Sequence, residues 1–246
     1  HRHSGYYLMF SKKEIVLDCY TYRSEVYNYF PIAKGSKHFP EFFKNTKKIP
    51  PKSSYGTLLH CPAFIDYFKL GFVLPLWSDL FLEVGQKGSG SYKWQYADER
   101  SQMDFHGENQ TGIPEKEYQQ FKLITPWVFS CKEDVQFLFS APSWHFESFP
   151  NTLSIVNAVV DFKRNAATNI NMVVQRLEQP HSFVLRANTP LIHLIPMTDK
   201  KIVLKTHLVP IEVYDSVEGP NRKVTFSSVC KKKIRNAHQG KFKTLA

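Results

Sequence analysis

The stretch "FKLITPWVFSCKEDVQFLFS", residues 121–140, decides the fold class of this chain. Two runs rich in β-branched and aromatic residues, 121–130 and 135–140, flank Cys131 and the charged residues 132–134. Such residues favour β-strands, and a short polar break between two of these runs is typical of a turn. We therefore expect two strands here and a mainly β protein.

The same pattern extends outward on both sides of this stretch. Short apolar segments recur at roughly 10–15 residue spacing, separated by proline, asparagine or charged turns. They cover residues 14–22, 72–84, 92–97, 153–162, 169–177, 181–197, 201–214 and 223–228. Many short strands at such spacing are typical of all-β folds, so we expect a jelly-roll-like sandwich or barrel.

Two segments have a helical rather than an alternating pattern. Residues 61–71, "CPAFIDYFKLG", combine an early proline, an apolar side and a final glycine, which predicts a helix. Pro40 similarly suits the first turn of a short helix over 40–47. The expected fold is therefore mainly β with one or two short helices.

The chain is short enough for one domain. We expect a single mainly β domain over residues 9–230, with a basic irregular segment at 31–54 included. Residues 1–8 precede Met9 and are interpreted as vector-derived, and residues 231–246 as a basic C-terminal tail.

The positive charge is concentrated in two segments. The net charge is +10, yet residues 34–52 alone hold six lysines and one glutamate, and residues 219–246 hold eight basic residues and no acid. The rest of the chain is close to neutral. Such segments attract polyanions, although solvated surface is the commoner explanation of a charge run.

Four cysteines, Cys19, Cys61, Cys131 and Cys230, lie far apart and form no Cys-x-x-Cys pair. Isolated cysteines fit a reducing compartment and argue against a cysteine-based zinc or redox site. There is no apolar run of 18 residues, so we expect no membrane-spanning helix.

A resemblance covers roughly residues 55–200. It is carried by "HCPAFIDYFKLGFVLPLWSDLFLEV" (60–84), "TPWVFSCKEDVQFLFSAP" (125–142), "VNAVVDFKRNAATNINM" (156–172) and "ANTPLIHLIPM" (187–197). In this order the segments resemble an uncharacterised family encoded by marine bacteriophages, especially those of cyanobacteria. The resemblance implies a phage origin, and it carries no catalytic residues that can be transferred.

One constellation has metal-ligating chemistry. His145 and Glu147 lie two positions apart in "APSWHFESFP" (141–150), so on a strand they share a face. His193 lies in a later expected strand. Two histidines and one carboxylate are the ligands of iron(II) oxygenases of the jelly-roll type, which use a 2-oxo acid. The alternative is a strand end with its aromatics on one face and a satisfied core histidine in the other strand, and it needs no cofactor.

A second constellation suits nucleic acid or another anion. The basic candidates are Lys44, Lys47, Lys48, Lys231, Lys232, Lys233 and Arg235. The tryptophans Trp77, Trp94, Trp127 and Trp144 could provide a stacking surface with Tyr92 and Tyr96. The alternative places these rings in the core.

Together these features favour a non-catalytic phage protein, either a structural or assembly component or an accessory binding protein. The expected partners are other phage or host proteins and, through the basic segments, nucleic acid, in the host cytoplasm or the virion. Edge strands of such a fold also allow a homo-oligomer. The metal-dependent oxygenase, with Fe(II), and the nucleic-acid-binding protein are the two alternatives.

Overall fold

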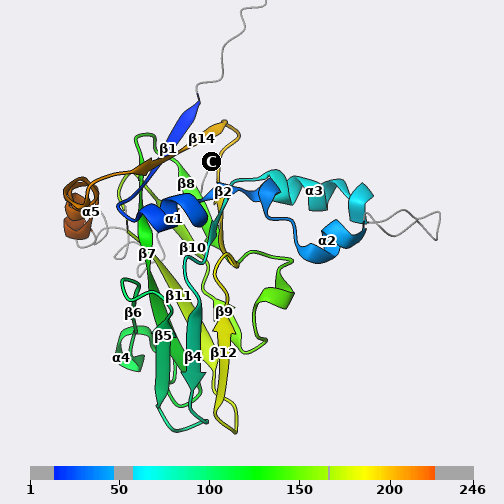
Figure 1. Cartoon of the computed structure of the whole chain (residues 1–246), viewed down its shortest axis with the longest axis vertical. Coiled ribbons are helices and arrows are strands. Elements are labelled where there is room, and N and C mark those ends of the chain that lie inside the picture. The colour runs from blue at the N-terminus through cyan, green and yellow to red at the C-terminus, as the bar shows by residue number, and fades with distance from the viewer. Residues whose placement is uncertain (1–13, 47–57, 166, 225–246) are drawn as a thin grey trace, which may run out of the picture.

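The computed structural model of the protein describes residues 14–46, 58–165 and 167–224. With 41% of residues in strands and 21% in helices it is mainly β, which confirms the expected fold class. The described strands form three sheets that pack together into a sandwich (Figure 1).

The largest sheet has six strands, and its central path runs β14-β1-β7-β11-β9, with β6 also paired to β7. Their bounds are β14 Ile202–Leu208, β1 Ile15–Thr21, β7 Tyr118–Cys131, β11 Ala167–Gln175, β9 Leu153–Ile155 and β6 Gln102–Asp104. Strands β1 and β14 are parallel, with Ile15 opposite Ile202, whereas the other pairs of this sheet are antiparallel.

The other two sheets are antiparallel. The five-stranded sheet has the order β10-β8-β13-β3-β2, and the three-stranded sheet has the order β12-β4-β5. Their bounds are β10 Ala158–Asp161, β8 Gln136–Ser140, β13 Pro190–Pro196, β3 Phe72–Pro75, β2 Ala33–Lys34, β12 His181–Leu185, β4 Leu80–Val84 and β5 Tyr92–Tyr96.

The stretch 121–140 lies at the centre of the sandwich. Both expected strands are confirmed as β7 and β8, but they belong to different sheets. The charged turn between them carries the chain from one sheet to the other, so the two apolar runs face each other across the core. Phe129 of β7 and Phe137 of β8 both pack on Phe162, with ring centroids 4.8 and 5.1 Å from it.

The helices differ from expectation more than the strands do. The described residues include five α-helices: α1 Ser24–Tyr29, α2 Glu41–Thr46, α3 Pro62–Lys69, α4 Glu108–Thr111 and α5 Ile211–Val224. Three short 3-10 helices are η1 Gly35–Lys37, η2 Leu58–His60 and η3 Phe146–Ser148. The expected helices over 61–71 and 40–47 are confirmed as α3 and α2.

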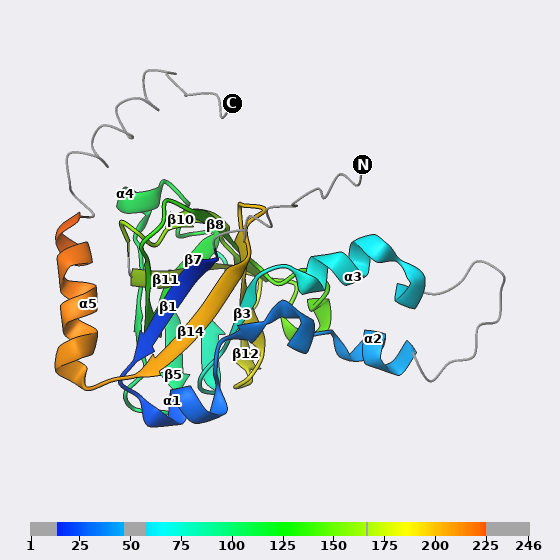
Figure 2. The same cartoon turned by 90° about the horizontal axis from the view of Figure 1, so that it is seen from above.

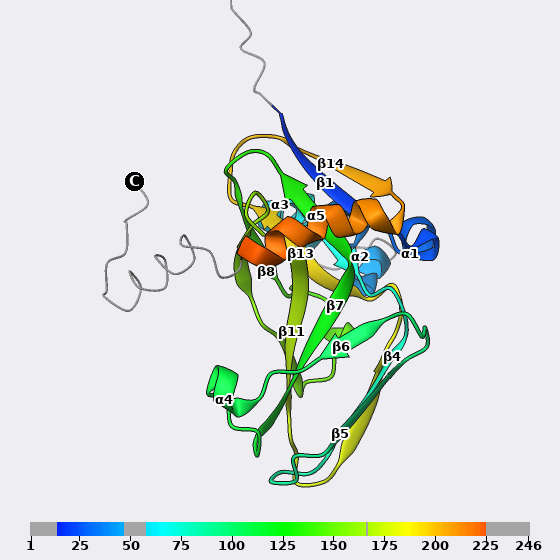
Figure 3. The ribbon, with the colours of Figure 1, turned by 90° about the vertical axis from the view of Figure 1, so that its left-hand side faces the viewer.

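The strand expected over 201–214 is wrong beyond Leu208. Strand β14 ends there, and α5 begins directly after Pro210, a residue that suits a helix start but cannot donate to a sheet. Helix α5 lies across β7 (Figure 3) and buries Tyr214 against Val128. The strand expected over 223–228 is also wrong at its first two residues, which end α5. Its remainder lies outside the described residues, as do residues 1–8 and the tail 231–246.

An arm projects from the sandwich between β2 and β3 (Figures 1 and 2). We define the arm as residues 35–46 and 58–71, which contain η1, α2, η2 and α3. Figure 2 shows the arm and α5 on opposite sides of the sandwich. The arm is the setting of the candidate site.

Candidate functional site

The arm has a small hydrophobic core of its own. Phe43, Phe64 and Phe68 are buried together, separately from the main core of the sandwich. Phe39 stacks on Phe43 with ring centroids 4.6 Å apart, and Phe64 contacts Phe68 at 5.0 Å. This aromatic cluster is why two short helices of six and eight residues hold their places, since helices of this length are marginal alone.

The arm leaves and rejoins the sandwich through two glycines that contact each other. The Gly35 amide donates to the Gly71 carbonyl at 3.1 Å. A Cβ on Gly35 would lie 2.8 Å from the Phe68 carbonyl oxygen, and Gly71 has a φ of +55° with no room for a side chain against the Leu194 carbonyl. The two ends of the arm therefore pack closely on each other at Gly35, and the second end packs directly on β13 of the sandwich at Gly71.

Two imidazoles of the sandwich hydrogen-bond backbone carbonyls of the arm. His145 Nε2 lies 2.8 Å from the His38 carbonyl oxygen, and His193 Nε2 lies 2.7 Å from that of Leu70. Because a carbonyl only accepts, both rings carry their proton on Nε2. Both histidines are buried, and they tie the two ends of the arm to the loop after β8 and to β13.

Burial lowers the pKa of all three histidines at this junction. For His38 the pKa falls to about 4, because burial is reinforced by the nearby His145 and Lys44 charges. Burial lowers the pKa of His145 and His193 too, against the opposing effect of their hydrogen bonds to carbonyl oxygens. At neutral pH the junction therefore holds three neutral imidazoles.

Two large aromatic side chains beside the arm are exposed. Trp144 is 44% exposed and Phe146 is 64% exposed. Trp144 packs edge-on against Phe64 of α3 with centroids 5.0 Å apart, and Phe146 stacks on Phe42 of α2 at 5.6 Å. We call Phe42, Trp144, Phe146 and the neighbouring lysines Lys37 and Lys44 the arm-root surface.

A pocket of about 320 Å³ opens at the loop after β8. It is lined by residues 141–146 together with Phe149 and residues 153–155, so Trp144 and Phe146 both border it. This volume is at the lower end of the range for small-molecule sites.

The arm-root surface carries two exposed lysines beside the exposed carboxylates of Glu41 and Glu147. Lys37 and Lys44 are exposed, and both contribute to lowering the pKa of His38. Lys44 makes an exposed ion pair with Glu41 at 3.3 Å, which is weak at the surface.

The predicted metal ligands are only partly brought together. The interpretation of residues 141–150 as a strand end is wrong, because β8 stops at Ser140 and residues 146–148 form η3. His145 and His193 both lie at the junction, but each Nε2 already donates to a carbonyl, and Glu147 is exposed on the 3-10 turn. Within the part of the chain that the structure describes, no three metal-ligating side chains converge.

The predicted anion-binding residues fall mostly outside the described residues. Lys44 lies on α2, whereas Lys47, Lys48, Lys231, Lys232, Lys233 and Arg235 are not described. Of the tryptophans, Trp77 and Trp127 are core residues and do not form a stacking surface. The sequence did not indicate three further residues of this surface and junction: His38, Phe42 and Phe146. The sequence signal near His38 and Phe42 is Pro40, which marks the start of α2.

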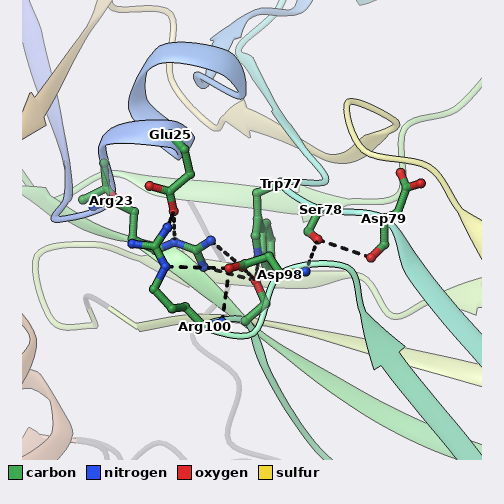
Figure 4. A network of polar contacts seen from close by, with 9 residues as sticks. Arg23, Glu25, Trp77, Ser78, Asp79, Asp98 and Arg100 are labelled. Atoms are coloured by element: carbon green, nitrogen blue, oxygen red, sulfur yellow. Dashed lines mark hydrogen bonds and ion pairs between the residues drawn. The ribbon is translucent and has the colours of Figure 1, made fainter.

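A second polar cluster lies at the start of α1 (Figure 4). The buried Arg23 donates from Nε to Glu25 at 2.7 Å, from Nη1 to Ser101 at 3.1 Å and from Nη2 to Asp98 at 2.5 Å. Arg100 contacts the same two carboxylates from the surface. The Nε, Nη1 and Nη2 atoms of Arg23 all donate within the protein, so this cluster locks the β1–α1 corner to the β5–β6 loop.

Comparison of the sequence with models of known protein families and with curated proteins found no match. The resemblance to phage proteins therefore stays a prediction. No helix within residues 14–46, 58–165 and 167–224 is long and apolar enough to cross a membrane.

Proposed function

We propose that the protein is a non-catalytic accessory or assembly protein that works by binding nucleic acid through its arm. The observation that carries the proposal is the arm-root surface, where exposed lysines lie beside exposed aromatic rings on a firmly packed support. The resemblance to phage proteins suggests that the protein acts in the host cytoplasm or the virion, and that other phage or host proteins are further partners.

Charge distribution supports this proposal. The chain carries a net charge of +10, and the arm begins within its basic segment 34–52. Lys34, Lys37 and Lys44 of this segment are exposed in the structure. A basic segment on an otherwise nearly neutral chain attracts a polyanion to that segment, and lysines bind phosphate as point charges.

The test is binding of fluorescent oligonucleotides by the full chain at several salt concentrations. If three to five phosphates are neutralised, raising the salt from about 50 to about 200 mM weakens binding roughly 20- to 100-fold, because bound counterions are released. Absence of binding at low salt would contradict the proposal.

A charge-matched pair of variants locates the binding. Lys37→Gln with Lys44→Gln should weaken binding and reduce its salt dependence. Lys93→Gln with Lys116→Gln removes the same charge from exposed positions on β5 and in the loop before β7, away from the arm (Figure 1), and should leave binding nearly unchanged. Equal effects of the two pairs would contradict a role for the arm.

The iron(II) oxygenase has less support. It requires Glu147 to turn toward His145 and His193 and both rings to release their carbonyl partners. Iron(II) uptake by the purified protein, measured by elemental analysis and abolished by His193→Gln, would favour it over the binding protein.

A further inference from the structure

We infer that the arm-root surface is a stacking site for unpaired bases of single-stranded nucleic acid. The inference rests on the proposed function and narrows it, because lysines alone bind single strands and duplexes, whereas a stacking site requires bases that are free of a partner strand.

The exposed rings of Trp144 and Phe146 each pack against one aromatic ring of the arm, which supports them on one side. Phe146 lies against Phe42 with an interplanar angle of 22°, so one face of the Phe146 ring is covered. Because Phe146 is 64% exposed, its other side is open to solvent. Trp144 is supported through its contact with Phe64 at an interplanar angle of 77°. Both rings therefore offer apolar surface without needing to move.

The backbone at Trp144 is unusual for such a large residue. Its φ of 73° lies in the left-handed region, which bulky side chains rarely adopt. The surrounding loop maintains it, since the Ser143 amide donates to the Tyr67 hydroxyl at 3.0 Å and the Ser148 amide to the His145 carbonyl at 2.9 Å. A strained residue that leaves an indole exposed is the kind of outlier that accompanies binding sites.

Two lysines and the pocket beside the exposed rings suit the phosphate and the sugar of a stacked nucleotide. The Lys44 charge acts on the pKa of His145, the residue between Trp144 and Phe146, and Lys44 and Lys37 both act on the pKa of His38, whose carbonyl His145 contacts. A base stacked on Trp144 or Phe146 therefore leaves its phosphate near a positive charge. The 320 Å³ pocket bordering both rings offers space for a base or sugar. In a duplex the bases are already stacked and cannot use these rings.

The test compares single-stranded oligo(dT), single-stranded oligo(rU) and a duplex of the same length by fluorescence anisotropy. About 12 nucleotides suffice, since one stacking groove covers roughly 4–16 nucleotides. We expect tighter binding of one or both single strands than of the duplex, and the DNA and RNA probes show which sugar is preferred.

The decisive variant is Trp144→Ala with Phe146→Ala. Loss of base stacking should weaken single-strand binding about 5- to 150-fold per base and leave duplex binding unchanged. The matched control is Trp94→Ala with Phe105→Ala, which removes rings that are 39% and 52% exposed elsewhere on the sandwich. Phe146→Ala alone keeps the Trp144–Phe64 contact, so it tests the surface if the double variant loosens the arm.

The outcomes separate the inference from the proposed function. If single strands and duplex bind equally and the Trp144 and Phe146 variants bind like the control, the protein binds nucleic acid but the stacking site is wrong. If no oligonucleotide binds even at low salt, the proposed function and the inference both fail. Self-association in sedimentation velocity that only the Trp144 and Phe146 variants lose, without oligonucleotide binding, would instead identify a protein contact and overturn the inference.

Discussion

Arg23→Gln should be among the most destabilising single substitutions in the protein, whereas Arg100→Gln should have little effect. Both arginines contact Glu25 and Asp98 (Figure 4). They differ in exposure, because the Arg23 side chain is 3% exposed and the Arg100 side chain is 58% exposed. The comparison therefore keeps the carboxylate partners constant and changes the burial of the cation.

The expected magnitudes follow from this difference. Removing one partner of a buried ion pair typically costs about 3–5 kcal/mol, and an exposed pair contributes about 0–1 kcal/mol. Because Arg100 and Ser101 still contact the two carboxylates in the Arg23 variant, we expect the lower end, about 3 kcal/mol. For a chain of this length that lowers the melting temperature by roughly 6–12 °C.

The assay is urea unfolding at pH 7, where the slope of the unfolding free energy against urea concentration should be the same for the wild type and the variants. The same measurement is then made at lower pH. Partial burial works to raise the pKa of Asp98 and Glu25, but their hydrogen bonds, including those from Arg23, outweigh it and hold both pKa values below their usual range. Carboxylates of this kind stabilise the fold above the unfolded pKa near 4, and the contribution is lost as the pH falls through the folded pKa.

The wild type should therefore lose more stability on acidification below about pH 4 than Arg23→Gln does. The reasoning would be refuted by equal losses for Arg23→Gln and Arg100→Gln at pH 7, or by a loss below about 1 kcal/mol for Arg23→Gln.

Three further predictions concern the arm. Gly71→Ala should lower the free energy of unfolding by more than about 3 kcal/mol, because the new Cβ overlaps the Leu194 carbonyl. Gly88→Ala is also at positive φ but in open space, so it should cost only about 1–2 kcal/mol. Thermal unfolding compares the two variants, and equal losses would contradict the packing argument. The pKa of His38 is lowered to about 4 by burial, so the fold disfavours the charged imidazole and loses stability as the pH falls below the unfolded pKa near 6.5. Stability should fall by about 2 kcal/mol between pH 7 and pH 5, and by less in His38→Gln. Phe68→Ala should reduce the stability of the arm by about 3–5 kcal/mol and increase amide hydrogen-exchange rates in α2 and α3 more than in β7. An equal increase in all these elements would show that the arm is not a separate packing unit.

The strands were predictable because their residues repeat a local pattern. Alternation in β1 leaves Leu17 and Cys19 buried between half-buried neighbours, and the paired runs at 121–140 mark two core strands. Pairing between distant segments leaves no such local trace, so the parallel contact of β1 with β14 could not be inferred. Helix α5 was missed because β-branched residues around Ile211 favour a strand locally, although Pro210 was a usable signal.

The candidate site was only partly accessible from the sequence. Trp144 and Lys44, two of the predicted contact residues, are exposed, but no local pattern distinguished Trp144 from Trp77 and Trp127, which lie in the core. The metal-site hypothesis grouped His145 with Glu147 because it assumed that both residues lie on one face of a strand. The true partners of His145 and His193 are backbone carbonyls of the arm, and no residue type identifies a carbonyl that lies close only after folding.

The most direct test of the central claim, that the arm-root surface binds single-stranded nucleic acid, is photo-crosslinking of a bromouridine-containing oligonucleotide followed by peptide mass spectrometry. The account predicts crosslinks at Trp144 or Phe146 and on the neighbouring α2, lost in high salt. Crosslinks confined to Trp94 or Phe105, or none at low salt, would contradict it.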